Sequence, residues 1–476
     1  MNLASYAGPV TSPYGNGKSS VAGDVAMTSP LAVIILAAGK GTRMKSDLHK
    51  VLHPIAGRPM LIHLIDSLNQ AGATRRVVVV GASGEQVEAA VAATGVEIAW
   101  QREQLGTAHA ALQAKDALSD FDGVAIVCFG DTPLLATETV ARLAARLEAE
   151  DAPTVAVLGF RPADARAYGR IIADADSTIA KMVEFKDASP EERAVDLCNS
   201  GVTAVRTRDL WRLLEAVGND NAAGEYYLPD IVTLAVAEGG RAVVIETGED
   251  EVAGVNSRAE LAAVEAGWQA ARRAQAMADG ATLIAPDTVW FSHDTQIGRD
   301  VVIEPNVVFG PGVSIADGAT IRAFSHLEGA KVGARADVGP YARLRPGADL
   351  AEKAKVGNFV EVKKATIGKG AKVNHLSYIG DADVGANANI GAGTITCNYD
   401  GFFKYKTSIG ADAFIGSNSA LVAPVSVGDG AIVAAGSVLT KDVEAGALAL
   451  VRPPQIAKPG WATKFRAMMR AKKEAK

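Results

Sequence analysis

The 476-residue sequence has few cysteines, only 5% aromatic residues and no large excess of either charge. Its three cysteines, Cys128, Cys198 and Cys397, lie far apart, which excludes a disulfide scaffold and a CxxC metal site and fits a reducing cytoplasm. The 48 lysine and arginine residues face 54 acidic ones, so the net charge of −6 provides no basic field for nucleic acid. Because no run of about 18 apolar residues occurs, we expect no membrane-spanning helix.

The two ends of the chain are expected to contribute little to the fold. Residues 1–30 are rich in Ser, Gly and Pro and lack a continuous apolar stretch, so they are predicted to form a disordered leader rather than a secretory signal. Met27 is an alternative start. Residues 463–476 form a basic tail, which we expect to be solvated and frayed; attraction of anionic ligands is the alternative.

Between residues 31 and 258, short apolar runs alternate with amphipathic stretches. Six of the runs are candidate strands, at 32–36, 76–81, 96–100, 124–130, 154–160 and 242–246. Helical patterns at 59–72 and 139–150 lie between some of them. This alternation predicts a doubly wound, Rossmann-like parallel α/β sheet, in which ligands bind at the carboxyl ends of the strands. The loops after residues 36 and 130 are therefore the candidate site.

A long Ala-rich helix is predicted over 258–282, and the sequence changes character beyond it. From Ile297 to Leu439 an apolar residue recurs every six positions, with a few five-residue steps, and glycine often follows it. A six-residue repeat is the signature of a parallel β-helix, with three hexads in each triangular coil and the leading aliphatic residue pointing inward. The period by itself does not fix the handedness. We therefore expect domains at 31–258 and 283–462, joined by a linker helix at 259–282.

The hexad period fails at 396–408, where the sequence reads TCNYDGFFKYKTS. A loop that leaves a solenoid usually lies on its binding face, so this segment is predicted to contribute to a site. The alternative is an insertion that the fold merely tolerates.

Two motifs in the first half suggest chemistry. LAAGKGTRM at 36–44 follows the first predicted strand, and its glycines would let backbone N–H groups approach a phosphate, with Lys40, Arg43 and Lys50 adding positive charge. The alternative is that these glycines serve only to form a tight strand-to-helix turn. Met44 replaces the third glycine of GxGxxG, which argues against a dinucleotide site. FGD at 129–131 ends a buried strand with an acid, which suits either a hard metal ion or a helix N-cap.

Taken together, these motifs and others resemble the sugar-1-phosphate nucleotidyltransferases. The further matching segments are SDLHKVL at 46–52, QREQLGTAHA at 101–110, VEFKDA at 183–188, NSG at 199–201, GEYYLPD at 224–230 and GVNSR at 254–258. With the hexapeptide repeats behind them, the chain resembles the bacterial N-acetylglucosamine-1-phosphate uridylyltransferase / glucosamine-1-phosphate N-acetyltransferase family. This resemblance implies a left-handed β-helix, a cytoplasmic homotrimer, Mg²⁺, the co-substrates UTP and acetyl-CoA, and a role in peptidoglycan and lipopolysaccharide precursor synthesis.

The resemblance also implies a uridylyl-transfer site. The residues that would line the nucleotide and face its phosphates are Leu36, Ala37, Ala38, Gly39, Arg43 and Lys50. Gln101 would read the uracil edge with Gly106 and Thr107, and Asp131 and Asn256 would hold the magnesium ion. Gly169, Glu184 and Asn199 would contact the sugar hydroxyls and N-acetyl group.

An acetyl-transfer site is implied by four segments of the second half: ARLRPGA at 342–348, GNFVEVKKA at 357–365, NHLSYIGDA at 374–382 and NIGAGTITCNYDG at 389–401. On this resemblance His375 is the general base, a task that suits a group titrating near neutral pH. Arg345 and Lys363 would grip the sugar phosphate, beside Tyr378 and Asn389. The acetyl-CoA site would be completed by Ala392, Asn398, Tyr399, Ser417, Ala435 and Arg452.

Two residues depart from the family pattern, and two other functions stay open. His49 stands where the family usually has proline, and Pro229 stands where it usually has threonine. One alternative is a sugar-1-phosphate nucleotidyltransferase whose β-helix only assembles subunits or binds a regulator. Another is a non-enzymatic solenoid that presents an interaction surface. His375 and the CNYDG segment argue against the first, and FGD with GVNSR argues against the second.

Overall fold

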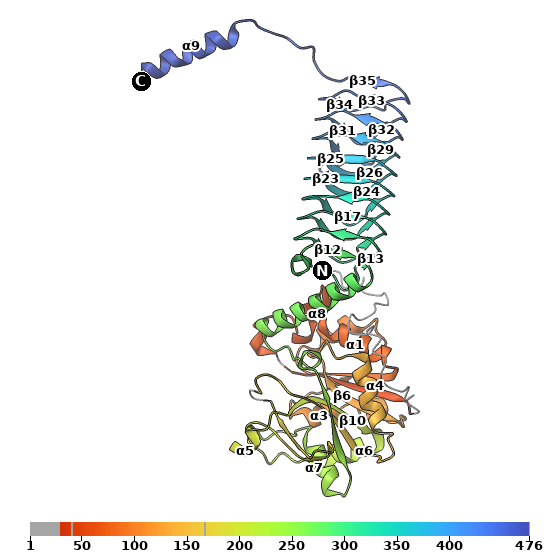
Figure 1. Cartoon of the computed structure of the whole chain (residues 1–476), viewed down its shortest axis with the longest axis vertical. Coiled ribbons are helices and arrows are strands. Elements are labelled where there is room, and N and C mark those ends of the chain that lie inside the picture. The colour runs from red at the N-terminus through yellow and green to blue at the C-terminus, as the bar shows by residue number, and fades with distance from the viewer. Residues whose placement is uncertain (1–28, 40, 166–167, 476) are drawn as a thin grey trace. The chain divides into compact units, whose positions relative to one another are not determined.

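The computed structural model describes residues 29–39, 41–165 and 168–475, so the predicted leader up to residue 28 and Lys40 lie outside the described residues. The chain divides into two compact units. The first runs to Ala278 and includes Trp290–Thr295, and the second comprises Asp279–Val289 and the chain from Gln296 onward (Figure 1). Within the described residues, no helix is both long and apolar enough to cross a bilayer.

The first unit is built on one mixed sheet. Its main strands follow the order β11 (Ala242–Thr247), β7 (Val155–Phe160), β10 (Cys198–Arg206), β6 (Val124–Phe129), β1 (Leu31–Ala37), β4 (Ala73–Val80) and β5 (Glu97–Trp100). The hairpin β8 (Arg170–Ala173) and β9 (Ile179–Val183) joins this sheet through β10, and the short strands β2 (Pro54–Ile55) and β3 (Arg58–Pro59) pair separately. The six predicted strands are therefore confirmed, with small shifts at their ends.

Helices surround this sheet. They are α1 (Met60–Gln70), α2 (Gly84–Val91), α3 (Thr107–Leu112), α4 (Thr137–Arg146), α5 (Pro190–Arg193), α6 (Thr207–Ala216), α7 (Asp230–Ala237) and α8 (Arg258–Ala278). The Ala-rich connector is thus a helix as predicted, although α8 ends four residues early. β1 is buried along its whole length because neighbours flank it on both sides, which is why its sequence LAVIILA is entirely apolar.

Strand β10 is the main feature that the sequence analysis missed. It runs antiparallel to both of its neighbours, β6 and β7, so the sheet is not purely parallel. Its first residues, from Cys198 to Gly201, are only partly apolar and lack the continuous hydrophobic run that marked the other strands. Because β10 is antiparallel, its polar beginning lies at the sheet edge where β6 ends. That edge is the candidate ligand-binding edge.

The second unit is the predicted β-helix, with short parallel strands stacked on three faces. One face comprises β12 (Thr282–Leu283), β14 (Val302–Ile303), β17 (Thr320–Ile321), β20 (Asp337–Val338), β23 (Lys355–Asn358), β25 (Lys372–His375), β27 (Asn389–Ile390), β30 (Phe414–Ile415), β33 (Ile432–Val433) and β35 (Leu448–Ala449). The second comprises β13 (Gln296–Ile297), β16 (Ser314–Ile315), β19 (Ala330–Val332), β22 (Ala348–Leu350), β29 (Thr407–Ile409) and β32 (Val425–Val427). The third comprises β15 (Val308–Phe309), β18 (His326–Leu327), β21 (Arg343–Leu344), β28 (Ile395–Cys397), β31 (Ala420–Val422) and β34 (Val438–Leu439), and the longer β24 (Glu361–Ile367) and β26 (Tyr378–Val384) pair with strands of both the second and the third face.

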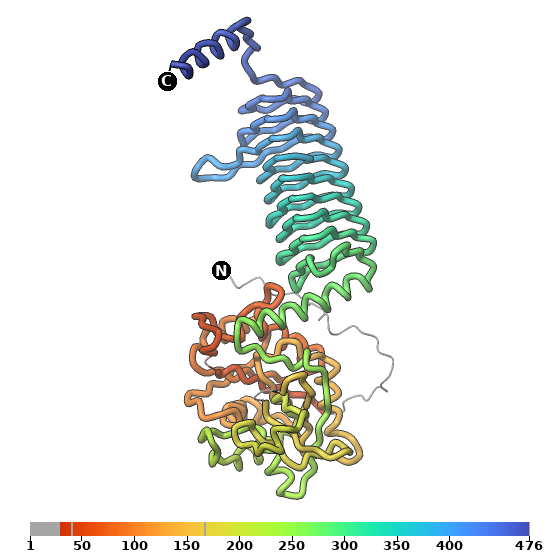
Figure 2. Tube along the Cα trace, turned by 60° about the vertical axis from the view of Figure 1, so that its left-hand side comes forward, coloured from red at the N-terminus to blue at the C-terminus, as the bar shows by residue number. Residues whose placement is uncertain are grey.

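The hexad periodicity correctly identified the inward positions. Every predicted hexad start from Ile303 to Leu439 is buried. The one polar member, Thr396, is 1% exposed and satisfies its hydroxyl by accepting a hydrogen bond from the Gly380 N–H at 2.8 Å. The predicted interruption is confirmed too, because the segment around 398–406 leaves the stack as a projecting loop (Figure 2).

The basic tail differs from the expectation of a frayed segment. Residues Trp461–Glu474 form helix α9, which begins after Gly460. Its sequence consists largely of Ala, Lys, Arg and Met, which are all good helix formers. The expectation of solvation holds, since every described residue of α9 is exposed.

The β-helix core predicts a difference between two isoleucines that occupy successive coils. Ile415 is 0% exposed and Ile432 is 48% exposed. We expect Ile415→Ala to lower the free energy of unfolding of the second unit by about 2–5 kcal/mol, because it leaves a cavity in a closed stack. Ile432→Ala, the matched control, should cost less than about 1 kcal/mol. Calorimetric unfolding measures both, and equal losses would contradict an inward role for the hexad starts.

Candidate active sites

Backbone pairing brings three distant segments together in the first unit. β1 and β6 are parallel neighbours with Leu36 opposite Phe129, so the loops that follow them leave the sheet side by side. The Gly130 N–H donates to the Leu36 carbonyl at 3.0 Å, and the Val255 N–H donates to the Asp131 carbonyl at 3.0 Å. The glycine-rich loop, the FGD motif and the GVNSR segment therefore meet at one edge, as the sequence analysis predicted for the first two.

A cation lies at the centre of this edge. The Lys50 ammonium forms a short hydrogen-bonded ion pair with the Asp131 carboxylate, and it also donates to Asn256 Oδ1 at 3.1 Å. Asn256 is held from behind, because its backbone N–H donates to Glu260 Oε2 at 2.8 Å. Two oxygen atoms from segments more than 100 residues apart thus converge on one positive charge.

The same two oxygen atoms fit a magnesium ion. Mg²⁺ prefers carboxylate and carbonyl oxygens and is commonly bound by one or two protein groups together with substrate phosphates and water. Asp131 Oδ2 and Asn256 Oδ1 already point toward a common cation, the Lys50 ammonium. Among the residues that the structure describes, no cluster of three or more His, Cys, Asp or Glu side chains offers an alternative metal centre.

Gln101 is buried beside the glycine-rich loop, in a position suited to a base. Its Nε2 donates to the Gly106 carbonyl at 3.0 Å and lies 3.0 Å from His109 Nδ1. Gly106 has φ +119° and a Cβ there would lie 2.5 Å from the Tyr226 carbonyl oxygen, so only glycine fits. Thr107 Oγ1 accepts a hydrogen bond from the Leu228 N–H at 2.8 Å, which ties this loop to the GEYYLPD segment.

A second group of residues lies around Gly169, Glu184 and Asn199. The Asn199 N–H donates to the Gly169 carbonyl at 2.9 Å, and Asn199 Oδ1 accepts from the Gly201 N–H at 2.8 Å, so the side chain is fixed. Burial raises the pKa of Glu184, and the carboxylates of Asp230 and Asp187 raise it further. A buried carboxyl group with a raised pKa, such as that of Glu184, is suited to hydrogen bonding with hydroxyl groups.

Two adjoining cavities of about 380 Å³ each collect these residues. Of the implied uridylyl-site residues, the first cavity is lined by Leu36, Ala37, Ala38, Gly39, Lys50, Gln101, Gly106, Thr107, Asp131 and Asn256. The second is lined by Thr107, Asp131, Gly169, Glu184, Asn199 and Asn256. Arg43 is not among the lining residues and lies exposed on the short 3₁₀ helix Thr42–Met44. Glu225 lines both cavities and Tyr227 lines the second; they belong to a recognised motif but were not assigned roles.

In the second unit, His375 is exposed on a corner of the β-helix and is oriented by Asn358. Asn358 and His375 are paired residues of β23 and β25, and His375 Nδ1 lies 2.7 Å from Asn358 Oδ1. Since that oxygen accepts a hydrogen bond from Nδ1–H, the lone pair of the neutral ring resides on Nε2. The sequence analysis missed Asn358, although it precedes His375 by 17 residues, close to one coil.

Several implied acetyl-CoA residues occupy equivalent positions in successive coils. Strand register puts His375 below Ala392, Ala392 below Ser417 and Ser417 below Ala435. The Asn418 N–H donates to the Ala392 carbonyl at 2.7 Å and the Gly436 N–H to the Ser417 carbonyl at 2.8 Å, which fixes this corner. Arg452 donates to the Ala435 carbonyl at 2.6 Å. These residues therefore lie in one column along the corner that also carries His375.

A cluster of basic side chains joins strand β24 to the projecting loop. Lys363 contacts Lys404, and this contact lowers the pKa of Lys363, with a smaller effect from the charge of Arg345. Arg345 forms an ion pair with Glu361 at 2.7 Å. Three cations held this close favour an anionic ligand that neutralises them. Lys404 comes from the projecting loop and was missed by the sequence analysis, which treated that loop as a whole.

The remaining implied residues lie at the base of the loop and on the adjacent strands. Asn398 Nδ2 donates to Asp381 Oδ2 at 2.5 Å and lies 3.5 Å from the Tyr378 hydroxyl. Tyr399 is 60% exposed, and its hydroxyl donates to the Gly401 carbonyl at 2.5 Å. Asn389 and Lys372 pair with each other on the first face of the β-helix. Tyr378 lies on β26, on the other side of the corner from them.

Comparison with known proteins agrees with both units. Residues 33–223 match the MobA-like NTP transferase domain, residues 294–329 match the bacterial transferase hexapeptide, and residues 406–441 match the hexapeptide repeat of succinyl-transferase. The Bifunctional protein GlmU of Rhizorhabdus wittichii is 69% identical over 447 residues, covering 94% of this chain and 99% of the relative. Those of Sphingopyxis alaskensis and Zymomonas mobilis are 63% and 59% identical, covering 94% and 92% of this chain and 99% and 98% of their own lengths. The chain therefore belongs to the GlmU family of bifunctional uridylyltransferases and acetyltransferases.

Proposed function

We propose that the second unit acetylates glucosamine-1-phosphate with acetyl-CoA, and that the first unit then transfers UMP from UTP to the product, giving UDP-N-acetylglucosamine and pyrophosphate. The observation that carries the first activity is the convergence of Asp131 and Asn256 on the Lys50 ammonium at the mouth of the two cavities. The cavities share Asp131, so a nucleotide in one and a sugar phosphate in the other would meet at that residue.

In the uridylyl-transfer step, the phosphate oxygen of N-acetylglucosamine-1-phosphate attacks the α-phosphorus of UTP, and pyrophosphate leaves. This chemistry requires alignment and charge neutralisation rather than a protein nucleophile. Lys50 supplies a positive charge to the phosphates, Arg43 adds another from its exposed position, and Gln101 orients the base. Glu184 and Asn199 hold the sugar. A magnesium ion held by Asp131 and Asn256 would stabilise negative charge on the phosphates.

In the acetyl-transfer step, the amine of glucosamine-1-phosphate attacks the thioester carbonyl of acetyl-CoA, the C–S bond breaks and CoA leaves as a thiolate, which then takes up the proton that His375 has accepted from the amine. The His375 Nε2 lone pair takes the proton that the amine loses, while the Nδ1–H bond to Asn358 keeps the ring in the required tautomer. Arg345, Lys363 and Lys404 would bind the sugar phosphate. The Ser417 hydroxyl, two coils further along the same column, would steady the developing oxyanion.

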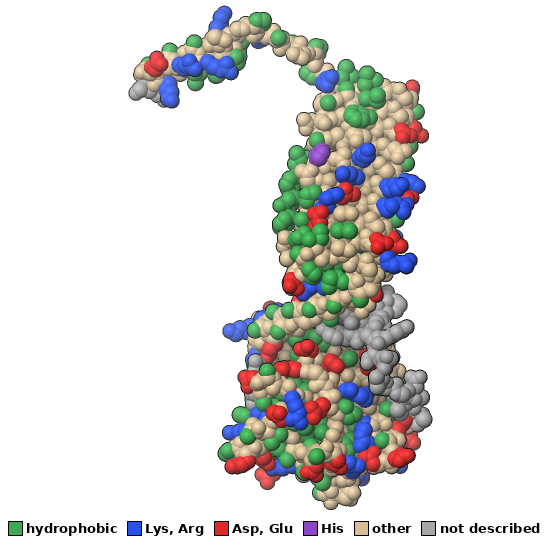
Figure 3. Space-filling view, viewed as in Figure 1, with side chains coloured by type: hydrophobic (Ala, Val, Ile, Leu, Met, Phe, Trp, Pro, Cys, Tyr) green, Lys and Arg blue, Asp and Glu red, His purple; other side chains and the backbone are tan. Residues whose placement is uncertain are grey.

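We further propose a cytoplasmic homotrimer with the loop around Tyr399 contributing to a neighbouring site. Two features support an assembly of β-helices. Hydrophobic side chains gather along one edge of the β-helix (Figure 3). Phe324, Tyr341 and Phe359 stack on one another in successive coils and are each about half exposed, which is unusual for large apolar side chains without a partner. A monomer that retained acetyltransferase activity would contradict this proposal.

The proposed function is tested by giving the protein glucosamine-1-phosphate, acetyl-CoA, UTP and magnesium, and following free thiol and pyrophosphate separately. We expect both products, with pyrophosphate release depending on acetyl-CoA. If only pyrophosphate appeared, and only with substrate acetylated beforehand, the β-helix would be a scaffold and the role of His375 would be withdrawn.

Asp131→Ala removes one of the two proposed magnesium ligands and leaves the Lys50 charge unpaired. We expect at least about a hundredfold loss of uridylyl transfer, in line with the loss of a group that stabilises transition-state charge. Acetyl transfer should be unchanged. Asp122→Ala, which removes an exposed acid just before β6, is the control and should retain both activities. Parallel loss of both activities in folded Asp131→Ala protein would count against two independent sites.

His375→Ala should produce the opposite result. We expect acetyl transfer to fall by about 10²–10⁴-fold, the usual contribution of a general base, with uridylyl transfer from acetylated substrate near normal. His326, another exposed histidine of the β-helix, provides the matched control, since it lies on β18, three coils before the coil of His375. Equal effects of His375→Ala and His326→Ala would exclude His375 as the base.

The departure at His49 is expected to be functionally neutral. His49 is 6% exposed and both ring nitrogens lack a hydrogen-bond partner among the described residues, while its backbone N–H donates to Gln86 Oε1 at 2.9 Å. Its φ of −55° suits proline. We expect His49→Pro to change stability by no more than about 1 kcal/mol, since it loses one hydrogen bond but removes two unpaired polar atoms. Thermal unfolding and the pyrophosphate assay check this, and a tenfold loss of uridylyl transfer would contradict it.

A further inference from the structure

The hairpin formed by β8 and β9 links the proposed sugar site to a distant ion-pair network. Gly169 and Glu184, which line the second cavity, immediately precede β8 and immediately follow β9. The turn at the other end comprises residues 174–178. At about 3.3 Å per residue, the four residues of β8 separate the turn from the cavity by more than 10 Å. The hairpin therefore acts as an arm whose inner end is a wall of the site.

Along its length this arm makes few backbone pairs with the main sheet, but its side chains Ile171, Ile179 and Met182 are buried in the hydrophobic core. Within the described residues, β9 pairs with β8 alone, and β8 pairs with β10 through a single residue pair, Arg170 and Cys198. The outer end is attached to β11 by a bridge between Thr178 and Val243 and by a hydrogen bond from the Val244 N–H to the Ser177 carbonyl at 2.9 Å. Core packing therefore fixes the middle of the arm, and the position of its outer end also depends on how the turn is held.

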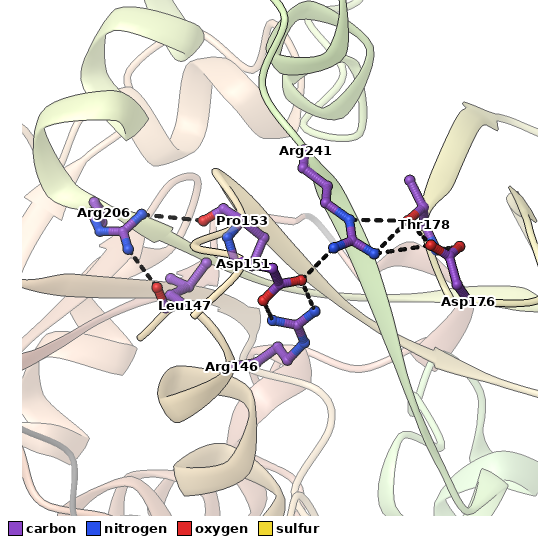
Figure 4. Close-up of polar contacts among 8 residues, drawn as sticks. All are labelled: Arg146, Leu147, Asp151, Pro153, Asp176, Thr178, Arg206 and Arg241. Atoms are coloured by element: carbon purple, nitrogen blue, oxygen red, sulfur yellow. Dashed lines mark hydrogen bonds and ion pairs between the residues drawn. The ribbon is translucent and has the colours of Figure 1, made fainter. Parts of the chain in front are cut away.

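Arg241, just before β11, makes the side-chain attachment to that turn (Figure 4). Its Nε and one terminal nitrogen donate to Thr178 Oγ1 at 3.0 and 2.8 Å, and the same terminal nitrogen donates to Asp176 Oδ2 at 3.1 Å. Asp176 in turn accepts hydrogen bonds from the N–H and hydroxyl of Thr178. These bonds lower the pKa of Asp176, with the charge of Arg241 adding to the effect.

The other side of Arg241 is fixed as well. Its remaining terminal nitrogen donates to Asp151 Oδ2 at 2.5 Å, and Asp151 also receives a two-pronged contact from Arg146 at 2.6 Å for each oxygen (Figure 4). The following segment is held by Arg206, which donates to the carbonyls of Pro153 and Leu147. The guanidinium of Arg241 is therefore held between the start of β7 and the turn of the arm, with little freedom to rotate.

We propose that Arg241 is a positioning residue for the sugar-phosphate substrate, acting through the β8–β9 hairpin on Gly169 and Glu184. The inference rests on the proposed uridylyl transfer to a sugar phosphate. An isolated exposed ion pair contributes little stability. The contacts of Arg241 act instead on geometry, because a displacement of about 1 Å at a binding wall is enough to reduce turnover of a substrate that must be aligned.

The test is Arg241→Gln in the full-length protein, with steady-state kinetics for both uridylyl-transfer substrates. We expect the KM for N-acetylglucosamine-1-phosphate to rise by about three- to tenfold, while the KM for UTP stays within about twofold, since the nucleotide cavity has no wall from the hairpin. The melting temperature should change by less than about 2 °C. Acetyl transfer by the same protein should be unaffected and serves as an internal measure of active enzyme.

Arg146→Gln is the matched control. It removes the same charge and a contact to the same carboxylate, Asp151, but Arg146 does not contact the hairpin. Its KM values should be those of the wild type. If Arg241→Gln does not fold, Asp176→Asn tests the same link from the turn side and should raise the same KM in the same direction.

The outcomes separate this inference from the proposed function. Wild-type protein that does not use N-acetylglucosamine-1-phosphate at all would overturn the proposed function. Active wild-type protein with Arg241→Gln and Arg146→Gln indistinguishable would overturn the inference alone. A rise in both KM values together would also overturn it, because it would indicate general loosening of the domain.

Discussion

Strand pairing in register is the constraint on which both units depend. In the first unit, β10 lies antiparallel between β6 and β7, so its polar beginning faces the edge where β6 ends. β1 ends at that edge too because it is parallel to β6. Three chain segments with different tasks are thereby delivered to one place, and the Val255–Asp131 backbone hydrogen bond adds a fourth. Without that pairing, the side chains of Asp131 and Asn256 would not both reach the Lys50 ammonium.

The same constraint of strand register acts along the axis of the β-helix. Each coil repeats the backbone of the one before, so a residue at a given corner has a counterpart directly above it. Asn358, His375, Ala392, Ser417 and Ala435 form such a column. The closed apolar interior makes the column rigid, since every inward position from Ile303 to Leu439 is buried.

The projecting loop around Tyr399 and the β8–β9 hairpin bring further charged and polar groups to the candidate sites. The segment around Tyr399 leaves the β-helix and carries Lys404 back to Lys363, which concentrates positive charge at one point. The β8–β9 arm leaves the mixed sheet and carries Gly169 and Glu184 to the second cavity. In both cases a short excursion from a regular framework adds charged or polar groups to those that the framework strands already carry.

Apolar patterning made the strands of the first half predictable, because buried parallel strands are continuously hydrophobic. It failed for β8, β9 and β10, whose sequences mix polar and apolar residues; in β10 the polar residues line the second cavity. Asn358 was missed because the sequence shows it only as one residue of a motif, whereas the structure shows it in contact with His375. Helix α9 was taken for a frayed segment because its charge was given more weight than its helix-forming composition.

The sequence by itself determined the class of each unit, the inward positions of the β-helix and the motifs that mark the two candidate sites, since these follow from local periodicity and from residue types at fixed spacing. Only the tertiary structure decided which distant residues meet. The antiparallel placement of β10, the contact of Lys50 with Asp131 and Asn256, the approach of Lys404 to Lys363 and the attachment of Arg241 to the hairpin turn all depend on strand order and loop path. These are set by packing across the whole unit, and no local pattern in the chain encodes them.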